Sequence, residues 1–262
     1  MEAAQSELLV SDDSYVRTIT INRPHRSNAL SRSVMEEMIE EVIRADDDPL
    51  VRAIVLVGAG ERAFCAGADL KDARVRDEAG EPFRLPMRGA HRNLFEVVLE
   101  CVTPTIAAIN GHAVGGGLEL AAACDLRVAS RAATLAMPEV KRGMGANFGS
   151  VVLPRLLPLS VALEMLLTGE PMTADDAARW GFVNRVVEPD EVLSTAQKLA
   201  GKIASNAPLS VRRVKAMAIA GIGLPMTAAL RLDLGPNPYL SEDRQEGIQA
   251  FVEKREPRWN GR

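Results

Sequence analysis

The sequence is poor in the residues that build metal sites and disulfide frameworks. It has three cysteines and three histidines in 262 residues, and neither set shows the short spacing of metal ligands. An odd number of widely separated cysteines also gives no disulfide framework, so we expect reduced, small core residues. The formal net charge of −4 argues against a general nucleic-acid surface. We therefore expect neither a metal site nor a nucleic-acid partner.

Long apolar runs are missing as well. No uninterrupted apolar stretch reaches the roughly 20 residues needed to cross a bilayer, so no membrane partner is expected. The first seven residues, MEAAQSE, lack the basic and apolar regions of a signal or transit peptide. With 47% hydrophobic and 25% charged residues, the chain has the composition of a globular protein. These features predict a soluble, cytoplasmic protein with a sizeable core.

What the sequence does contain is an alternation of strand and helix patterns. Apolar runs typical of strands alternate with helical patterns, and Ser33 and Glu36 have the spacing of a capping box at the start of the first helix. This alternation predicts an α/β core over residues 1–200, followed by a helical C-terminal region over residues 201–262 in the same continuous assembly. The expected strands lie at 15–21, 53–57, 105–109 and 125–129, and the expected helices at 33–46, 88–101 and after Gly117.

A run of three glycines, Gly115 to Gly117, precedes an apolar helix that carries Glu119 one turn later. The first N–H groups of a helix have no partner within it, glycine lets an oxygen approach them, and the helix dipole favours negative charge there. This arrangement predicts an oxyanion hole beside a carboxylate that can transfer protons. Such a run also occurs in tight turns, and a buried glutamate also occurs as a paired structural carboxylate.

A second loop of small residues supports the oxyanion hole. The segment AFCAGADL, from Ala63 to Leu70, directly follows an apolar strand, and its small side chains let another backbone donor reach a ligand. A further carboxylate, Glu139, lies 20 residues after Glu119 in the segment AMPEV. Two carboxyl groups on one side of a substrate can divide proton transfer, since one accepts a proton while the other supplies one.

Together, residues 63–70 and 110–125 resemble the enoyl-CoA hydratase/isomerase family, the crotonases. The resemblance covers nearly the whole chain, because it includes NRP at 22–24, NAL at 28–30, Pro138-Glu139, SEDR at 241–244 and FVEKR at 251–255. It implies an α/β fold built as a spiral of ββα turns. It also implies that the helical C-terminal region supports a homotrimer, or a hexamer made of two trimers.

The resemblance further implies a reaction: reversible syn hydration of a trans-2-enoyl-CoA to a 3-hydroxyacyl-CoA, in fatty-acid or related acyl-CoA metabolism. The amides of Ala68 and Gly116 would hold the thioester oxygen, Glu119 would activate water, and Glu139 would transfer a proton at C2. The division of roles between the two glutamates stays open, since both can bind the same water. No separate cofactor is expected, because coenzyme A is part of the substrate. Its expected contacts are Ala66, Asp69, Leu70, Lys71 and Arg26, where Lys71 and Arg26 could equally be solvated surface charges.

One segment departs from the family pattern. The glycine-rich run after Glu139 commonly ends in Gly-Gly-Thr, whereas residues 143–150 read GMGANFGS. Asn147 occupies a position whose backbone often helps to hold the catalytic water, and Phe148 adds bulk nearby, so acyl-chain preference stays open. An enoyl-CoA isomerase, with one principal acid/base, is the alternative enzyme, and the presence of both glutamates favours hydration. The intact glutamates argue against a non-catalytic acyl-CoA-binding member, and the acidic charge balance argues against an RNA-binding one.

Overall fold

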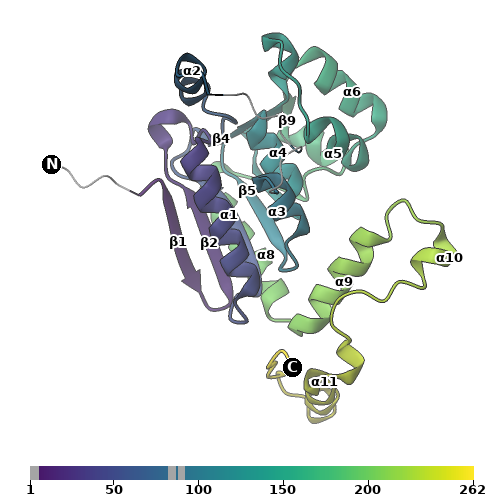
Figure 1. The fold of residues 1–262 in the computed structure, drawn as a ribbon. Coiled ribbons are helices and arrows are strands. Elements are labelled where there is room, and N and C mark those ends of the chain that lie inside the picture. The colour runs from purple at the N-terminus through teal and green to yellow at the C-terminus, as the bar shows by residue number, and fades with distance from the viewer. Residues whose placement is uncertain (1–5, 82–86, 88–91) are drawn as a thin grey trace.

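The computed structural model describes residues 6–81, 87 and 92–262 (Figure 1). Its centre is a six-stranded sheet with the strand order β1-β2-β3-β5-β7-β10. β1 pairs antiparallel with β2, and the other neighbouring strands are parallel. Parallel strands are covered on both faces, which explains why every residue of β3 and β5 is buried. The strands are β1 Leu8–Asp13, β2 Val16–Ile21, β3 Ala53–Gly58, β5 Thr105–Ile109, β7 Leu126–Ser130 and β10 Arg185–Val187.

A second, smaller sheet has the order β4-β6-β8-β9. Its strands are β4 Ala63–Cys65, β6 His112–Val114, β8 Thr134–Ala136 and β9 Met172–Thr173. The chain passes from β3 to β4, from β5 to β6 and from β7 to β8, so each turn adds one strand to each sheet before a helix follows. The predicted α/β spiral of ββα turns is therefore confirmed. Three-residue strands are too short to show a hydrophobic period, so the sequence did not predict this second sheet.

Helices cover both faces of the main sheet. Alternate residues of β3 point to opposite sides: Ile54 and Leu56 pack with α1, α3 and α4, whereas Val55 and Val57 pack against α8. The helices are α1 Arg32–Asp47, α2 Leu70–Glu78, α3 Leu94–Glu100, α4 Gly116–Ala123, α5 Gly149–Leu156, α6 Leu159–Thr168, α7 Ala174–Arg179 and α8 Val192–Ala204. None of the helices in the described part of the chain has the length and apolar character needed to span a bilayer.

The start of α1 differs from the prediction. Ser31, and not Ser33, is the N-cap: its hydroxyl accepts a hydrogen bond from the Val34 N–H at 3.3 Å, so the predicted Ser33–Glu36 capping box is wrong. A capping box does occur at α3, between Asn93 and the Glu96 side chain. The helix expected over residues 88–101 is described only from 92 onward, since 88–91 lie outside the described residues.

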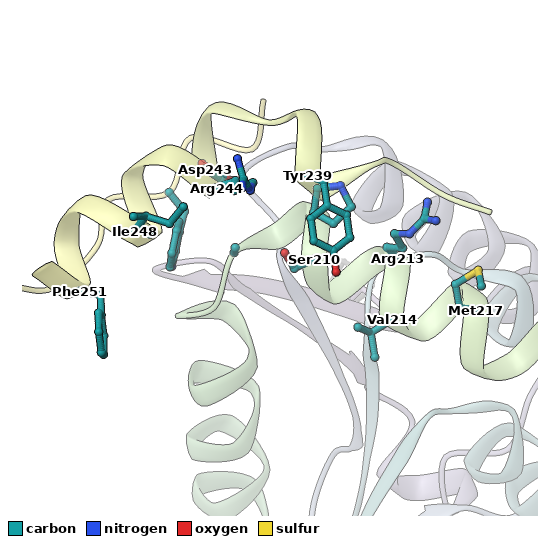
Figure 2. Close-up of a pocket in the computed structure, with 13 residues that line it drawn as sticks. Ser210, Arg213, Val214, Met217, Tyr239, Asp243, Arg244, Ile248 and Phe251 are labelled. Carbon is teal, nitrogen blue, oxygen red and sulfur yellow. The ribbon is translucent and has the colours of Figure 1, made fainter. Parts of the chain in front are cut away.

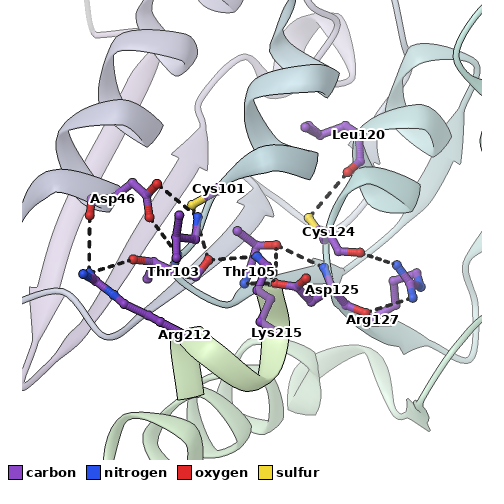
Figure 3. Close-up of polar contacts among 11 residues, drawn as sticks. Asp46, Cys101, Thr103, Thr105, Leu120, Cys124, Asp125, Arg127, Arg212 and Lys215 are labelled. Atoms are coloured by element: carbon purple, nitrogen blue, oxygen red, sulfur yellow. Dashed lines mark hydrogen bonds and ion pairs between the residues drawn. The ribbon is translucent and has the colours of Figure 1, made fainter. Parts of the chain in front are cut away.

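The C-terminal helices project away from the sheet (Figure 1). They are α9 Pro208–Ala220, α10 Met226–Ala229 and α11 Glu242–Glu253. Polar contacts fasten α9 to the core (Figure 3): Lys215 Nζ lies 2.6 Å from Asp125 Oδ2 and 3.1 Å from the Thr103 carbonyl oxygen. One turn earlier in α9, Arg212 donates to the Asp46 carbonyl. The division expected at residue 200 falls within α8, whose buried face still packs against the main sheet.

Candidate active site

The first predicted loop presents the amide of Ala68 to the second loop. Leu30 N donates to the Gly67 carbonyl at 2.8 Å, and Asp69 N donates to the Leu30 carbonyl at 2.9 Å. The C=O and N–H of one trans peptide point in opposite directions, and Gly67 C=O shares a peptide with Ala68 N–H. Because that carbonyl points toward Leu30, the Ala68 N–H points away from it. A Cβ built on Gly116 would lie 3.6 Å from Ala68 N, so the two loops meet here.

The second loop places Gly116 at the first position of α4, where backbone N–H groups have no partner within the helix. Two of its contacts require glycine. Gly67 has φ +84°, and a Cβ there would lie 2.9 Å from Gly116 N. A Cβ on Gly117 would lie 2.0 Å from the Cys65 carbonyl oxygen. Only glycine allows backbones to approach this closely. The structure thus brings together the two amides that the sequence predicted as oxyanion donors.

Glu119 projects from the first turn of α4 and is 8% exposed. Its Oε1 accepts a hydrogen bond of 2.7 Å from the N–H of Gly149, which is the first residue of α5. Burial raises the pKa of Glu119, the Gly149 N–H lowers it, and the charge of Glu139 raises it further. The Gly149 N–H therefore holds the Glu119 side chain in place, while burial makes its ionised form energetically unfavourable. This combination is typical of a proton-transfer group.

Glu139 approaches the same place from the short 3₁₀ helix Pro138–Arg142. A Cβ on Gly115, which has φ +56°, would lie 2.6 Å from Glu139 Oε1, so the carboxyl group lies against the start of α4. Its Oε2 is buried and has no hydrogen-bond partner among the described residues. Burial raises the pKa of Glu139 as well. A buried carboxyl oxygen without a partner is uncommon, and a substrate or water at this point would satisfy it.

Two phenylalanines adjoin these groups. A Cβ on Gly116 would lie 3.4 Å from Phe95 Cζ, so the Phe95 ring covers the backbone at the start of α4. The Phe95 and Phe148 rings lie 5.5 Å apart with an interplanar angle of 44°. Phe148 is buried and directly precedes Gly149. The sequence singled out Phe148 but not Phe95, because no spacing rule links residue 95 to the glycine run.

The residues expected to contact coenzyme A lie in different environments. Ala66, Leu70, Lys71 and Arg26 are exposed, whereas Asp69 is buried. The Asp69 carboxylate pairs with Arg23 at 3.0 Å and caps α2 through the N–H groups of Lys71 and Asp72. Although burial opposes ionisation, these partners lower the pKa of Asp69. Its side chain therefore supports the first loop. A role for these five residues in coenzyme A binding stays a prediction.

The NRP and NAL segments also support this loop. Asn28, at φ +56°, accepts a hydrogen bond from Arg23 N and donates to the carbonyls of Ala59 and Ala63. Arg23 reaches Asp69 from the same turn. These contacts fix the chain on either side of the Ala68 amide. Among the residues described, no cluster of three or more histidine, cysteine or acidic side chains could hold a metal ion.

A groove of about 880 Å³ lies elsewhere, between α9 and α11 (Figure 2). Its lining combines apolar side chains such as Val214, Met217 and Ile248 with the charged Arg213 and Asp243. Neither glutamate of the candidate active site contributes to it. The groove belongs to the projecting C-terminal region and is separate from the carboxyl groups on α4 and the 3₁₀ helix.

Comparison with known proteins identifies the family. The sequence matches the enoyl-CoA hydratase/isomerase family over residues 12–262. It is 41% identical to (E)-benzylidenesuccinyl-CoA hydratase from Thauera aromatica, over 94% of this chain and 96% of the relative. It is also 41% identical to carnitinyl-CoA dehydratase from Proteus mirabilis, over 94% and 95%. The crystal structure of enoyl-CoA hydratase from Mycobacterium tuberculosis superposes with a TM-score of 0.88 at 34% identity, covering 98% of this chain and 100% of that one. The chain has the crotonase fold and belongs to the enoyl-CoA hydratase/isomerase family.

Proposed function

We propose that this protein is an enoyl-CoA hydratase that adds water reversibly and syn across the double bond of a trans-2-enoyl-CoA. The observation that carries the proposal is the meeting of two carboxyl groups with raised pKa, Glu119 and Glu139, beside the amides of Ala68 and Gly116. Hydration needs both kinds of group. The amides stabilise the negative charge that develops on the thioester oxygen, and one such donor typically contributes about 10²–10³ in rate.

The carboxyl groups divide the proton transfers. Glu119 is assigned to the water, because the Gly149 N–H fixes its Oε1 in one orientation from which the carboxyl group can bind and position a water molecule. Glu139 is assigned to C2, because its buried Oε2 has no hydrogen-bond partner among the described residues and can carry the proton that C2 receives. The two groups interact, so they titrate as a coupled pair, and the proton returns by the same route in dehydration. An isomerase needs one principal carboxyl group, and the close pair therefore favours hydration.

Coenzyme A enters as part of the substrate, without a separate cofactor. Ala66 and Leu70 are exposed at the first loop, beside the Ala68 amide that binds the thioester oxygen in this proposal. Lys71 and Arg26 are exposed cations that suit the phosphates of coenzyme A. The relatives named above act on different acyl groups, benzylidenesuccinyl and carnitinyl, so the family alone leaves the acyl group open. We place the reaction in cytoplasmic acyl-CoA metabolism, of fatty acids or related acids.

We further propose that the protein assembles as a homotrimer or as a hexamer of two trimers. The C-terminal region exposes large apolar side chains, each at least 70% exposed: Ile222, Met226, Leu230, Leu240, Phe251 and Val252. Contact with other copies would cover them. Light scattering coupled to size exclusion tests this, and a monomer at micromolar concentration would refute it.

The reaction is tested with crotonyl-CoA and a longer trans-2-enoyl-CoA. The loss of absorbance of the conjugated thioester is followed, and the product is identified by mass and by comparison with a 3-hydroxyacyl-CoA standard. We expect a product heavier by one water, formed by the wild-type protein and not by a Glu119→Gln/Glu139→Gln control. A product of unchanged mass with a shifted double bond would assign an isomerase. Binding without turnover would assign a non-catalytic acyl-CoA-binding protein.

A further inference from the structure

We propose that Phe95 and Phe148 form an aromatic wall that selects acyl-CoA substrates carrying an aromatic ring on C3. The inference rests on the proposed function, because it names the substrate class of the same site. It assigns a specificity role to Phe95, which lies on α3, far in sequence from both the glycine run and the two glutamates.

The wall lies along the path that the acyl group would follow. Phe95 Cζ lies against the backbone of Gly116, which carries one of the amides assigned to the thioester oxygen. Phe148 directly precedes Gly149, whose N–H holds the carboxyl group assigned to the water. The thioester carbon C1 belongs at the first point and the hydrated carbon C3 near the second. Because the rings lie 5.5 Å apart, the pair extends from the point assigned to C1 toward the one assigned to C3, and a substituent on C3 would lie beside it.

The geometry of the pair suits a third ring. The centroid distance of 5.5 Å and the tilt of 44° fall in the range of favourable aromatic contacts, about 4.5–7 Å. Phe148 is buried in the core and is thus held in one orientation, whereas Phe95 is only partly buried. A ring on C3 can pack edge-to-face or offset against Phe95. Such a contact favours binding by about 2- to 12-fold beyond the effect of buried area.

The wall also disfavours polar substituents. A phenylalanine ring offers no hydrogen-bond donor or strong acceptor, so a hydroxyl or charged group placed against it would lose its water without replacement. A saturated aliphatic ring can fill the same space but lacks the aromatic quadrupole. Discrimination between a phenyl and a cyclohexyl ring therefore isolates the contribution of aromatic packing from that of size and apolar area.

Two saturated analogues test the proposal by isothermal titration: 3-phenylpropanoyl-CoA and 3-cyclohexylpropanoyl-CoA. Neither contains the C2–C3 double bond, so differences in reactivity do not enter. We expect wild-type protein to bind the phenyl analogue about 2- to 12-fold more tightly. Phe95→Leu, which keeps apolar bulk, should reduce this ratio to about one, whereas the matched control Phe95→Tyr should retain it.

Equal affinities in the wild-type protein, or an unchanged ratio in folded Phe95→Leu, would overturn the proposal. The wild-type ratio decides the question even if Phe95→Leu fails to fold, and circular dichroism and oligomer size report on folding. Hydration of crotonyl-CoA is measured separately. A protein that distinguishes the two rings but hydrates nothing refutes only the proposed function. A protein that hydrates crotonyl-CoA but binds the phenyl and cyclohexyl analogues with equal affinity refutes only the aromatic wall.

Discussion

The Gly149 N–H donates to Glu119 Oε1 at 2.7 Å and so joins the first turn of α4 to the first turn of α5. The surroundings of position 149 are tight: a Cβ there would lie 2.8 Å from Met137 Cε and 3.3 Å from Glu119 Oε1, so a side chain would require both neighbours to shift. The bond orients the carboxyl group without a second charge, because a backbone donor at a helix N-terminus stabilises an anion. Glu119 is thereby fixed in position while burial still raises its pKa.

Replacing either carboxyl group should nearly abolish hydration. We expect Glu119→Gln and Glu139→Gln each to lower kcat for an enoyl-CoA by about 10²-fold or more, since a positioned acid or base typically contributes on that scale. Glutamine keeps the size and one acceptor oxygen, so the circular dichroism spectrum and oligomer size should stay unchanged. Wild-type turnover in either variant would remove that residue from the mechanism.

The raised pKa of Glu119 predicts a pH-dependent stability difference. Below the ordinary value of 4.5 the carboxyl group is protonated in both folded and unfolded protein. As pH rises through the higher folded pKa, the folded protein must ionise a buried group, so its free energy of unfolding falls. Glutamine does not titrate. The stability of Glu119→Gln relative to wild type should therefore increase from pH 4 to pH 8 in urea unfolding at fixed protomer concentration, and a constant difference would contradict the pKa shift.

The amide of Gly116 can be removed by proline. The proline Cδ is attached to a nitrogen that Gly67 approaches closely, so circular dichroism and oligomer size must show that the variant folds. Gly116 is the first residue of α4, a position where proline is well tolerated, and a Cβ there meets Phe95 Cζ at an acceptable 3.4 Å. Gly116→Pro lacks the N–H, whereas Gly116→Ala retains it and serves as the matched control. We expect the proline variant to have a kcat about 10²–10³-fold below that of the alanine variant. Equal rates in two folded variants would exclude this amide from the oxyanion hole.

The parts of the site that sequence could predict are those set by local chemistry. The glycines at 115–117 come at the start of an apolar helix. Glycine lacks a Cβ, and backbone sterics alone explain why only glycine allows the close contacts made there. Glu119 then lies one turn into that helix by its 3.6-residue period. The family resemblance added the assignment of Ala68 and Glu139, which no local rule supplies. The long strands of the main sheet were predictable because burial on both faces produces continuous apolar runs.

Contacts between distant segments were not predictable. Gly149 meets Glu119 across 30 residues, and Phe95 meets Gly116 through the packing of α3 on α4, so neither has a sequence spacing to detect. The choice of Ser31 over Ser33 as helix cap is a local exception. Ser31 directly precedes the helix, whereas Ser33 lies within its first turn. The Leu30–Ala68 bridge holds the chain extended up to Ser31 and so fixes where the helix begins.

Lys215 and Asp125 form an ion pair between α9 and the core. Their charged atoms lie 2.6 Å apart, and the side chains are 10% and 22% exposed. Asp125 Oδ2 also accepts from the backbone and hydroxyl of Thr105, so the pair ties α9 to the start of β5 (Figure 3). A charge-assisted bond with this little exposure contributes more than a surface ion pair, because solvent screens it less.

Breaking this contact should loosen α9. We expect Lys215→Met and Asp125→Asn each to lower the free energy of unfolding by about 1–3 kcal/mol, since each leaves a partly buried polar group without its partner. The double variant should lose less than the sum of the two, by a coupling of roughly 0.5–3 kcal/mol. If α9 sets the surface through which copies associate, light scattering should show the single variants dissociating at a higher protein concentration than the wild-type protein.

Arg179→Met provides a control, because Arg179 pairs with Asp176 on the exposed surface of α7. Additive losses in the double variant would show that the two residues stabilise the protein independently and that their contact does not hold α9 to the core.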